Sequence, residues 1–571
     1  MQNTVYLKAY SSGDYYLDNK NIILPLESLL TLSVYKVCNP AEVTLTFVYE
    51  SNVNDDYEVK FEVDDEELCF MASNLAPWQV TSCVLPVVIF DDLVITGLCA
   101  VARHICVYRS SPPFAPEHEE GLLGFRHSCL QAPNETSIWT KFCEIDMVKT
   151  VKDIVKNNKL DIMPINLLRF ENHLNKPVKL HNVYKLARDL KKSNLKKELE
   201  IDSSLKIEDL NIDHQFAEGP FLTLADLILY PSYSIIIRRI GYDELKHLLP
   251  QSSKWFDTIK NNSEMGSINK ILDKIEISPC IVESITIPET ENVSLYKCDP
   301  KRHNPKKRLF TKEIDIESAL NTLTDEMEIS IIENEYNFGA IDWDKVPDGA
   351  NPTAGHLPNE RKDRKTQQLE NLTLAVLNIA KDDDLIVDFC CGSGHLGILL
   401  AHLLPRCTII LLENKEQSLL RARRRVKDVN FKNVYFFQCN LDFFIGKFDI
   451  GIGLHACGIA SDLVLDKCLK ANAKFVLCPC CYGSLHATDR LVYPRSVKFS
   501  LVPQDKYLCI GHAADQTHED HPLAVRGARC MAIIDSDRGR LAEELGYKVT
   551  LSRLKPLSCT PKNNLLIGVP S

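Results

Sequence analysis

Short apolar runs that end in a polar side chain recur through the last third of the sequence. The first, Leu385–Phe389, precedes a glycine-rich turn and then apolar residues at helical spacing. Later runs end at Glu413 and at Asp442, and a fourth run reaches His455. Runs of this length, bounded by turn residues, are typical of buried parallel strands. The pattern predicts an open α/β sheet with polar groups gathered at the carboxyl ends of its strands.

The preceding part of the chain follows other patterns. Alternating β-rich runs fill residues 1–110, and helical spacing of apolar residues dominates residues 130–285. Residues 286–350 are polar and irregular, which is typical of a linker. We therefore predict a degenerate thioredoxin-like domain, a helical domain, a polar linker and, over residues 351–571, a cofactor-binding α/β domain.

Composition narrows the classes of protein that need to be considered. A chain of 571 residues with 45% hydrophobic and 25% charged residues is ordinary globular protein of several domains. Its net charge of −11 supplies no global attraction to nucleic acid. Apolar runs are too short to cross a bilayer, and no secretory signal is apparent, so we expect a cytoplasmic protein. The 21 cysteines are then expected to be mostly reduced thiols.

The glycine-rich turn is compatible with two kinds of cofactor. Gly392-Ser-Gly-His-Leu-Gly397 matches the Gly-x-Gly-x-x-Gly pattern of dinucleotide sites. Asp388, four residues earlier, would place a negative charge beside a bound pyrophosphate. S-adenosylmethionine carries a sulfonium and an α-ammonium group and no phosphate, so the acid favours its binding.

Two further acids extend this prediction. Glu413 follows the next strand, where a carboxylate accepts hydrogen bonds from ribose hydroxyls in either kind of cofactor. Asp442, with the amide side chain two residues before it, is placed to reach an adenine amino group.

A histidine and several cysteines follow the later strands. His455 has the near-neutral pKa of a general base for methyl transfer, although a structural histidine is an equally good interpretation. Cys478, Cys480 and Cys481 follow the predicted fifth strand, with Cys457 expected nearby. Their spacing is more crowded than that of a usual Cys-x-x-Cys pair, and no second pair is present. We therefore predict burial or an acceptor-pocket lining, and no metal site.

A basic cluster lies in the polar segment. Its cationic residues are Lys301, Arg302, Lys306, Lys307 and Arg308. A solvated linker is the commoner meaning of such a run, but the same charges suit contacts with phosphate groups. We keep this cluster as the predicted contact surface for an RNA substrate.

The first half of the chain resembles the glutathione S-transferases at two places. The segment that begins at Val84 is similar to the end of their thioredoxin-like half, with Pro86 at the position of their cis-proline. Thr96 and Gly97 replace the acid-serine pair that holds glutathione in that family. Thr223 and Asp226 form a Thr-x-x-Asp capping box that resembles a motif of the family's helical domain. The resemblance implies a module for packing or recognition without the glutathione clamp.

Four motifs in the C-terminal part resemble a class I methyltransferase domain. They begin at Asp388, Leu454, Cys478 and Pro561, and they are similar to those of the glutathione S-transferase C-terminal domain-containing protein family. The resemblance implies a seven-stranded sheet with its last strand antiparallel. It also implies S-adenosylmethionine contacts from Asp388, Gly392, Gly394, Glu413 and Asp442. Related domains occur in proteins thought to act on RNA.

Together these observations predict an S-adenosylmethionine-dependent methyltransferase that acts on RNA. The glutathione-transferase-like module is predicted to be non-catalytic and to contact a protein partner. Two alternatives stay open. One is a non-catalytic scaffold that docks its partner through this module, and the other is a glutathione transferase, which the degenerate clamp disfavours.

Overall fold

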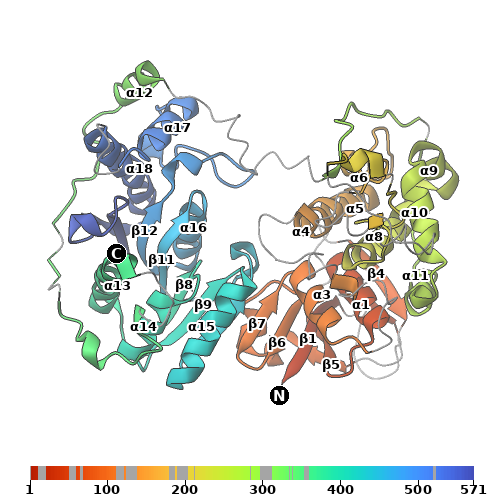
Figure 1. Cartoon of the computed structure of the whole chain (residues 1–571), viewed down its shortest axis with the longest axis horizontal. Coiled ribbons are helices and arrows are strands. Elements are labelled where there is room, and N and C mark those ends of the chain that lie inside the picture. Colours follow the sequence, from red (N-terminus) through yellow and green to blue (C-terminus); the bar gives the residue numbers. More distant parts are fainter. Residues whose placement is uncertain are drawn as a thin grey trace. The chain divides into compact units, whose positions relative to one another are not determined.

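The chain divides into two compact units in the computed structural model, Met1–Lys306 and Lys307–Ser571 (Figure 1). The four finer domain boundaries stay predictions. The structure describes residues 2–10, 21–50, 59–64, 69–110, 121–123, 138–178, 187–188, 204–210, 212–282, 284–295, 312–333, 335–336, 339–352, 359–517 and 523–571.

The first unit begins with a strand-rich part. Its elements are β1 (Asn3–Tyr10), β2 (Asn21–Pro25), α1 (Leu26–Cys38), β3 (Thr44–Glu50), β4 (Lys60–Asp64), β5 (Cys69–Ala72), α2 (Trp78–Thr81), β6 (Val87–Phe90), β7 (Leu93–Thr96) and α3 (Leu98–Val107). Strand β1 pairs in parallel with β3 and antiparallel with β6, which in turn pairs antiparallel with β7. This order is thioredoxin-like, as predicted, and the Leu85–Pro86 peptide is cis.

The second part of this unit is helical. Its helices are α4 (Ile138–Lys141), the π-helical turn η4 (Phe142–Asp146), α5 (Met147–Lys156), α6 (Ile165–Leu174), α8 (Leu224–Ile240), α9 (Tyr242–Leu248), α10 (Pro250–Lys260) and α11 (Gly266–Leu272). The predicted capping box of Thr223 and Asp226 begins α8. The fully buried Asp226 also accepts hydrogen bonds from the Ala217 N–H at 2.7 Å and the Trp255 indole at 2.8 Å. One carboxylate thereby joins three segments of the helical core.

The second unit alternates strands and helices. Its elements are α12 (Glu313–Leu320), α13 (Asn359–Ile379), β8 (Leu385–Phe389), α14 (His395–Leu403), β9 (Thr408–Glu413), α15 (Glu416–Val429), β10 (Val434–Gln438), β11 (Ile450–Cys457), α16 (Ala460–Ala471), β12 (Lys474–Cys480), α17 (Gln504–Ala513), α18 (Ala524–Glu544), β13 (Tyr547–Arg553) and β14 (Asn564–Pro570). Helix α12 lies within the segment predicted as a linker. Cys478 and Cys480 lie inside β12, so the prediction that they follow this strand is wrong.

The sheet of this unit has the strand order β13-β14-β12-β11-β8-β9-β10 over its described residues. Strands β8 to β12 are parallel, and β14 is antiparallel to both of its neighbours. This confirms the class I methyltransferase fold, including the predicted antiparallel last strand. All but the first residue of β8 and of β9 are buried, and most are apolar, because helices cover both faces of a parallel sheet.

Two layers of helices enclose this sheet (Figure 1). Helices α13, α14 and α15 form one layer, and α16 and α18 form the other. Because β8 to β12 are parallel, their carboxyl ends lie at one edge of the sheet, where open α/β folds bind ligands. None of the described helices combines the length and the apolar character needed to cross a bilayer.

A buried ionic network holds the second helical layer to the sheet. The guanidinium of Arg538, on α18, is 1% exposed and donates two hydrogen bonds to Asp462 at the start of α16, at 2.9 and 2.8 Å. It also donates to Asp535 at 2.9 Å. Asp535 in turn accepts hydrogen bonds of 2.7 Å from the Tyr482 hydroxyl and the Asn564 amide. The network joins α16, α18, the turn after β12 and the start of β14.

We expect Arg538→Met to lower the free energy of unfolding of the second unit by about 3–5 kcal/mol, because it leaves the buried carboxylate of Asp535 without its cation and that of Asp462 with Arg495 alone. Hydrogen exchange of α18 and β14 peptides in the full chain, followed against urea, measures the change. Arg529→Met is the matched control, since exposed Arg529 on the same helix pairs with Glu328 and should contribute only about 0–1 kcal/mol. Equal effects of the two substitutions would contradict the role of the network.

Candidate functional site

The glycine loop connects β8 to α14 at the middle of the sheet edge. Cys390, Gly392 and Gly394 have φ values of 55°, 57° and 71°, so the chain turns repeatedly through the left-handed region. The N–H of Gly394 closes one turn by donating to the Cys391 carbonyl at 2.9 Å. Glycine adopts this conformation without steric cost, and a side chain at Gly392 would meet no other atom within 4 Å. The backbone at Gly392 is therefore open to a ligand.

Asp388 lies beneath this loop. It is 3% exposed, and its Oδ2 accepts a hydrogen bond from the Gly397 N–H at 3.0 Å. Burial raises the pKa of this carboxyl to about 7. A Cβ at Gly397 would lie 2.3 Å from a methyl carbon of Leu411 and 3.1 Å from the same Oδ2. The third glycine of the motif thus permits close packing of helix on strand, as the pattern requires.

Glu413 occupies the end of β9 and faces the same loop. Its Oε2 accepts from the Gly392 N–H at 2.9 Å, and its Oε1 accepts from the Lys415 N–H at 2.9 Å. Each oxygen of an ionised carboxylate has a second lone pair, so both retain capacity for ribose hydroxyls. The structure therefore brings Asp388, Gly392, Gly394 and Glu413 together around one loop.

Asp442 is placed differently. It lies in the turn after β10, where it is exposed and forms a two-point ion pair with Arg490, one hydrogen bond of which is 2.8 Å long. Asn440 is the closer candidate for an adenine contact. Its Oδ1 lies 3.3 Å from the side-chain nitrogen of Asn414, which directly follows Glu413.

His455 belongs to a distorted part of β11. Its φ is 65°, and the pairing of β11 with β12 shifts register between Leu454 and Cys457. Its Nε2 lies 3.0 Å from the Oε1 of Gln368 on α13. Burial lowers the pKa of the imidazole to about 4, with a smaller contribution from the cation of Lys365. His455 is thus neutral at pH 7 and intrinsically a weak base.

Lys365 on α13 was not among the predicted cofactor-binding residues. The sequence shows only four cations near the start of this helix, and helical spacing alone does not identify which one faces inward. The ammonium group of Lys365 interacts with Asp388 and His455, and burial lowers its pKa. Within the described residues, no hydrogen bond or ion pair engages its Nζ. Arg361 and Arg364, in contrast, are exposed.

Arg425 was also missed, because it lies in a run of arginines on α15 that reads as a solvated helix face. Its side chain is 6% exposed and donates to the Ser393 carbonyl of the glycine loop and to the Gly349 carbonyl, both at 2.9 Å. It also lies 3.2 Å from Nδ1 of His395, the first residue of α14. Since Arg425 can only donate, Nδ1 accepts and the imidazole proton resides on Nε2.

The basic cluster and the degenerate glutathione clamp, also predicted from the sequence, belong to other segments of the chain than the glycine loop. The basic cluster Lys301, Arg302, Lys306, Lys307 and Arg308 lies outside the described residues. The hydroxyl of Thr96 donates internally to the Val84 carbonyl at 2.6 Å. The N–H of Cys99, at the start of α3, donates to the carboxylate of Glu144 at 2.8 Å. A side chain of the protein itself therefore occupies the helix start at which the resemblance places the γ-glutamyl group of glutathione.

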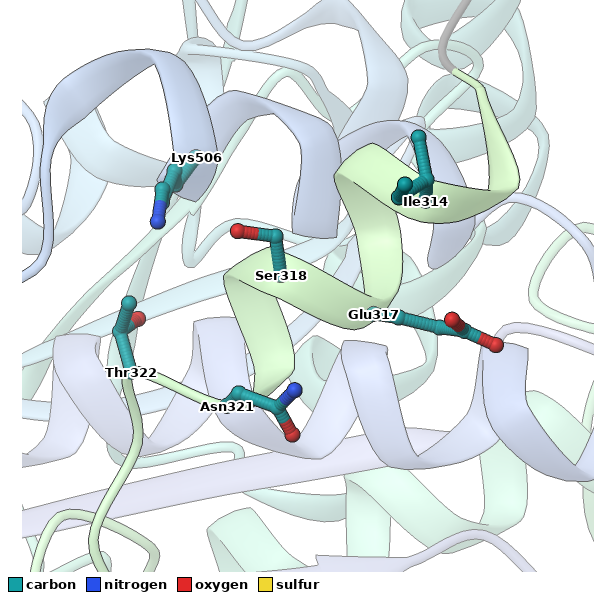
Figure 2. A pocket seen from close by; sticks show the side chains of 6 residues that line it. All are labelled: Ile314, Glu317, Ser318, Asn321, Thr322 and Lys506. Atoms are coloured by element: carbon teal, nitrogen blue, oxygen red, sulfur yellow. The ribbon is translucent and has the colours of Figure 1, made fainter.

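A separate depression lies between α12 and α17 (Figure 2). Figure 2 shows the ammonium of Lys506 and the hydroxyls of Ser318 and Thr322 facing one space, with Glu317 and Asn321 directed elsewhere. None of the predicted site residues lines it.

Comparison with known proteins identifies the family. A family model described as a methyltransferase domain matches residues 364–488. The Drosophila melanogaster homolog of glutathione S-transferase C-terminal domain-containing protein is 41% identical over 571 residues, covering 95% of each chain. The human protein of that name is 32% identical over 641 residues, covering 99% of each chain. The chain belongs to the glutathione S-transferase C-terminal domain-containing protein family. Among solved structures, magnesium protoporphyrin IX methyltransferase from Synechocystis, with bound S-adenosylmethionine, is 15% identical at a TM-score of 0.24, over 41% of this chain and 100% of that chain.

This family member therefore contains a methyltransferase domain, as predicted. S-adenosylmethionine is the predicted cofactor. The site fits that cofactor in two respects. The buried acid Asp388 lies at the glycine loop and is influenced by the half-buried cation Lys365, and a pair of opposite charges suits a zwitterionic amino-acid group. The open backbone at Gly392 stands beside the carboxylate of Glu413.

We expect His395 to make the second unit sensitive to acid. Burial lowers the pKa of its imidazole to about 3, so between pH 6.5 and 3 the unfolded chain binds a proton that the folded chain does not. Stability is then lost as the pH falls, by about 2 kcal/mol from this group between pH 7 and 5. His395→Gln keeps an acceptor for Arg425 and lacks the titration. Hydrogen exchange of β8 and α14 peptides against urea should show the variant gaining about 2 kcal/mol on the wild type over this range, and parallel curves would contradict the assignment.

Proposed function

We propose that this protein is an S-adenosylmethionine-dependent methyltransferase that modifies RNA, with Asp388, Lys365, Gly392 and Glu413 as its principal cofactor contacts. The observation that carries the proposal is the buried carboxylate of Asp388 at the carboxyl end of β8, held by the Gly397 N–H at 3.0 Å, with the ammonium of Lys365 near enough to lower the pKa of that carboxyl. The methionine part of the cofactor carries one ammonium and one carboxylate. Asp388 suits the former and Lys365 the latter.

The remaining cofactor contacts follow from the strand ends. The carboxylate of Glu413 is held by the N–H groups of Gly392 and Lys415, so its orientation is already set. A carboxylate fixed in this way accepts ribose hydroxyls with little loss of side-chain entropy. Asn440, beside Asn414, offers an amide for the adenine. Asp442 remains a weaker candidate, because its carboxylate is engaged by Arg490.

Bound S-adenosylmethionine supplies an activated methyl group, and the protein must place an acceptor in line with it. His455 is well positioned for this task, since its hydrogen bond to Gln368 fixes the ring at the strand end. With a pKa of about 4 it starts neutral, so it is able to take a proton only from an acceptor that becomes acidic during transfer. We propose that His455 chiefly orients the acceptor and receives a proton late in the reaction.

RNA is the proposed acceptor because exposed cations adjoin the site on a protein of negative net charge. Arg361 precedes Lys365 by four residues, so both lie on the same side of α13, and exposed Arg364 adjoins them. Such groups bind phosphates and hold a polyanion beside the cofactor. The basic cluster at residues 301–308 stays a second predicted contact for RNA. A cytoplasmic location suits such a substrate.

The glutathione-transferase-like unit is proposed to recognise a protein partner. Its capping box and its Glu144 contact serve the internal structure, and the Glu144 carboxylate disfavours glutathione as a ligand. The alternative function for the whole chain is a scaffold without catalysis. A scaffold would not transfer a methyl group to RNA, and it need not bind S-adenosylmethionine.

We expect S-adenosylmethionine to bind the full chain in a calorimetric titration. Lys365→Met should weaken binding about 30-fold or more, because a partly buried charge pair with the cofactor carboxylate contributes about 2 kcal/mol or more. Lys362→Met is the control, since it makes the same change one turn away on α13. No binding by the wild type would contradict the enzyme and support a scaffold. Equal affinity of both variants would exclude only the contact from Lys365.

For the acceptor, we expect methyl-labelled cofactor incubated with total RNA and with protein extract to label RNA. Arg361→Glu combined with Arg364→Glu should lower RNA labelling at least about tenfold and weaken its salt dependence, with cofactor affinity unchanged. Lys432→Glu combined with Lys447→Glu makes the same change in charge at exposed positions before β10 and β11, at the opposite edge of the sheet. Label confined to protein would contradict RNA as the substrate class.

A further inference from the structure

Three cysteine side chains converge at the carboxyl ends of two neighbouring strands. Cys457 ends β11, Cys480 ends β12, and Cys481 follows directly. Their sulfur atoms all lie within 4.8 Å of one another, and those of Cys457 and Cys480 are 3.4 Å apart. All three are thiols rather than halves of a disulfide. Cys457 is exposed, so the group is reachable from solvent.

A bulge in β11 brings the first thiol into this group. Leu454 pairs with Cys478, but the next pair is Cys457 with Cys480, so three steps along β11 match two along β12. In regular pairing Ala456 would stand opposite Cys480. The extra residue is accommodated where His455 adopts a φ of 65°. Bulges of this kind redirect side chains and are enriched beside functional sites.

A second distortion brings the other two thiols together. Adjacent residues of an extended strand point to opposite faces, so consecutive cysteines do not normally share a site. Cys481 has a φ of 55°, which ends β12 and turns its side chain back toward Cys480. Left-handed conformations at residues other than glycine cost free energy and persist where the surrounding structure holds them. Two such residues, His455 and Cys481, bring the same three sulfur atoms together.

We propose that Cys457, Cys480 and Cys481 bind one zinc ion through three thiolates and leave its fourth position open. Tetrahedral zinc with Zn–S bonds of about 2.3 Å places its sulfur ligands about 3.8 Å apart. The closest pair here is 3.4 Å apart, and no pair exceeds 4.8 Å. Small side-chain rotations therefore form the site. Three protein ligands with an open position is the arrangement of a catalytic, exchangeable zinc site.

Zinc binding to this site requires the three thiols to lose their protons. The hydrogen bond between Cys480 and Cys457 and burial raise the pKa of Cys480, and burial raises that of Cys481. All three cysteines are free thiols without an ion. Zinc binding breaks three S–H bonds, forms three Zn–S bonds and releases three protons to solvent, which leaves a net charge of −1 on the site.

The proposed ligand set differs from the sequence motif. Cys478 belongs to the Cys-Pro-Cys-Cys run, but its thiol donates to the Lys562 carbonyl at 3.5 Å and lies outside the group. The positions of the cysteines along the sequence therefore do not identify which three form the site. The edge that carries the zinc site also carries His455, so an open zinc position would be available to a bound acceptor. That consequence rests on the proposed function, whereas the metal site does not.

The test is the metal content of the full chain, purified without a chelating affinity tag. We expect about one zinc ion per chain by mass spectrometry of the elements, and loss of it in Cys457→Ser or Cys481→Ser. Affinity should fall by more than the roughly 100-fold that loss of an outer partner costs. Two control variants should retain the ion. Cys69→Ser removes an exposed thiol of the first unit, and Cys478→Ala removes a thiol from β12, the strand that carries Cys480.

A second measurement on the wild type guards against misfolded variants. Added Zn²⁺ should protect exposed Cys457 and half-buried Cys481 from N-ethylmaleimide, as read by peptide mass spectrometry, and should leave Cys69 reactive. Absence of zinc together with absence of protection would overturn the proposal. A disulfide between Cys457 and Cys480 in freshly purified chain would overturn it as well, since the pair would then be a redox couple.

Discussion

A single buried cation organises the methyltransferase half of this protein. Arg538 is almost completely enclosed, and its guanidinium is satisfied by Asp462 and Asp535. A buried charge of this kind is tolerated only when every partner is in place, because an unpaired ion in a protein interior is costly. The network therefore demands that four segments, far apart in sequence, reach their positions together.

The same network connects three of the sequence motifs that resemble a methyltransferase domain. Asp462 ends the motif that begins at Leu454, Tyr482 ends the cysteine run, and Asn564 belongs to the motif at Pro561. All three side chains meet around Arg538 and its partner Asp535. The Tyr482 ring also lies 5.5 Å from the cations of Arg538 and Lys562. Because Tyr482 directly follows Cys481, the network holds the turn that presents the thiols.

A second buried arginine acts at the glycine loop. Arg425 binds the loop carbonyl at Ser393 and the carbonyl of Gly349, and so holds the loop against the segment before α13. Rigid support of this kind allows the loop to keep left-handed residues and an open backbone at Gly392. In the first unit, the carboxylate of Glu144 instead fills the start of α3. The protein thus leaves the loop before α14 open to a ligand, whereas a carboxylate of its own accepts the hydrogen bond at the start of α3.

The sequence by itself determined the strand–loop–helix centre of the methyltransferase fold and its candidate cofactor residues. Strand ends, the glycine pattern and the acids Asp388 and Glu413 are local signals, because strand periodicity and turn geometry depend on neighbouring residues. Tertiary structure alone decided the rest. It selected Lys365 from four cations, turned Asp442 toward Arg490, and separated Cys478 from the thiol group that joins Cys457 to Cys480 and Cys481. These outcomes depend on which faces pack together and on a one-residue bulge, and neither is encoded within a short window of sequence.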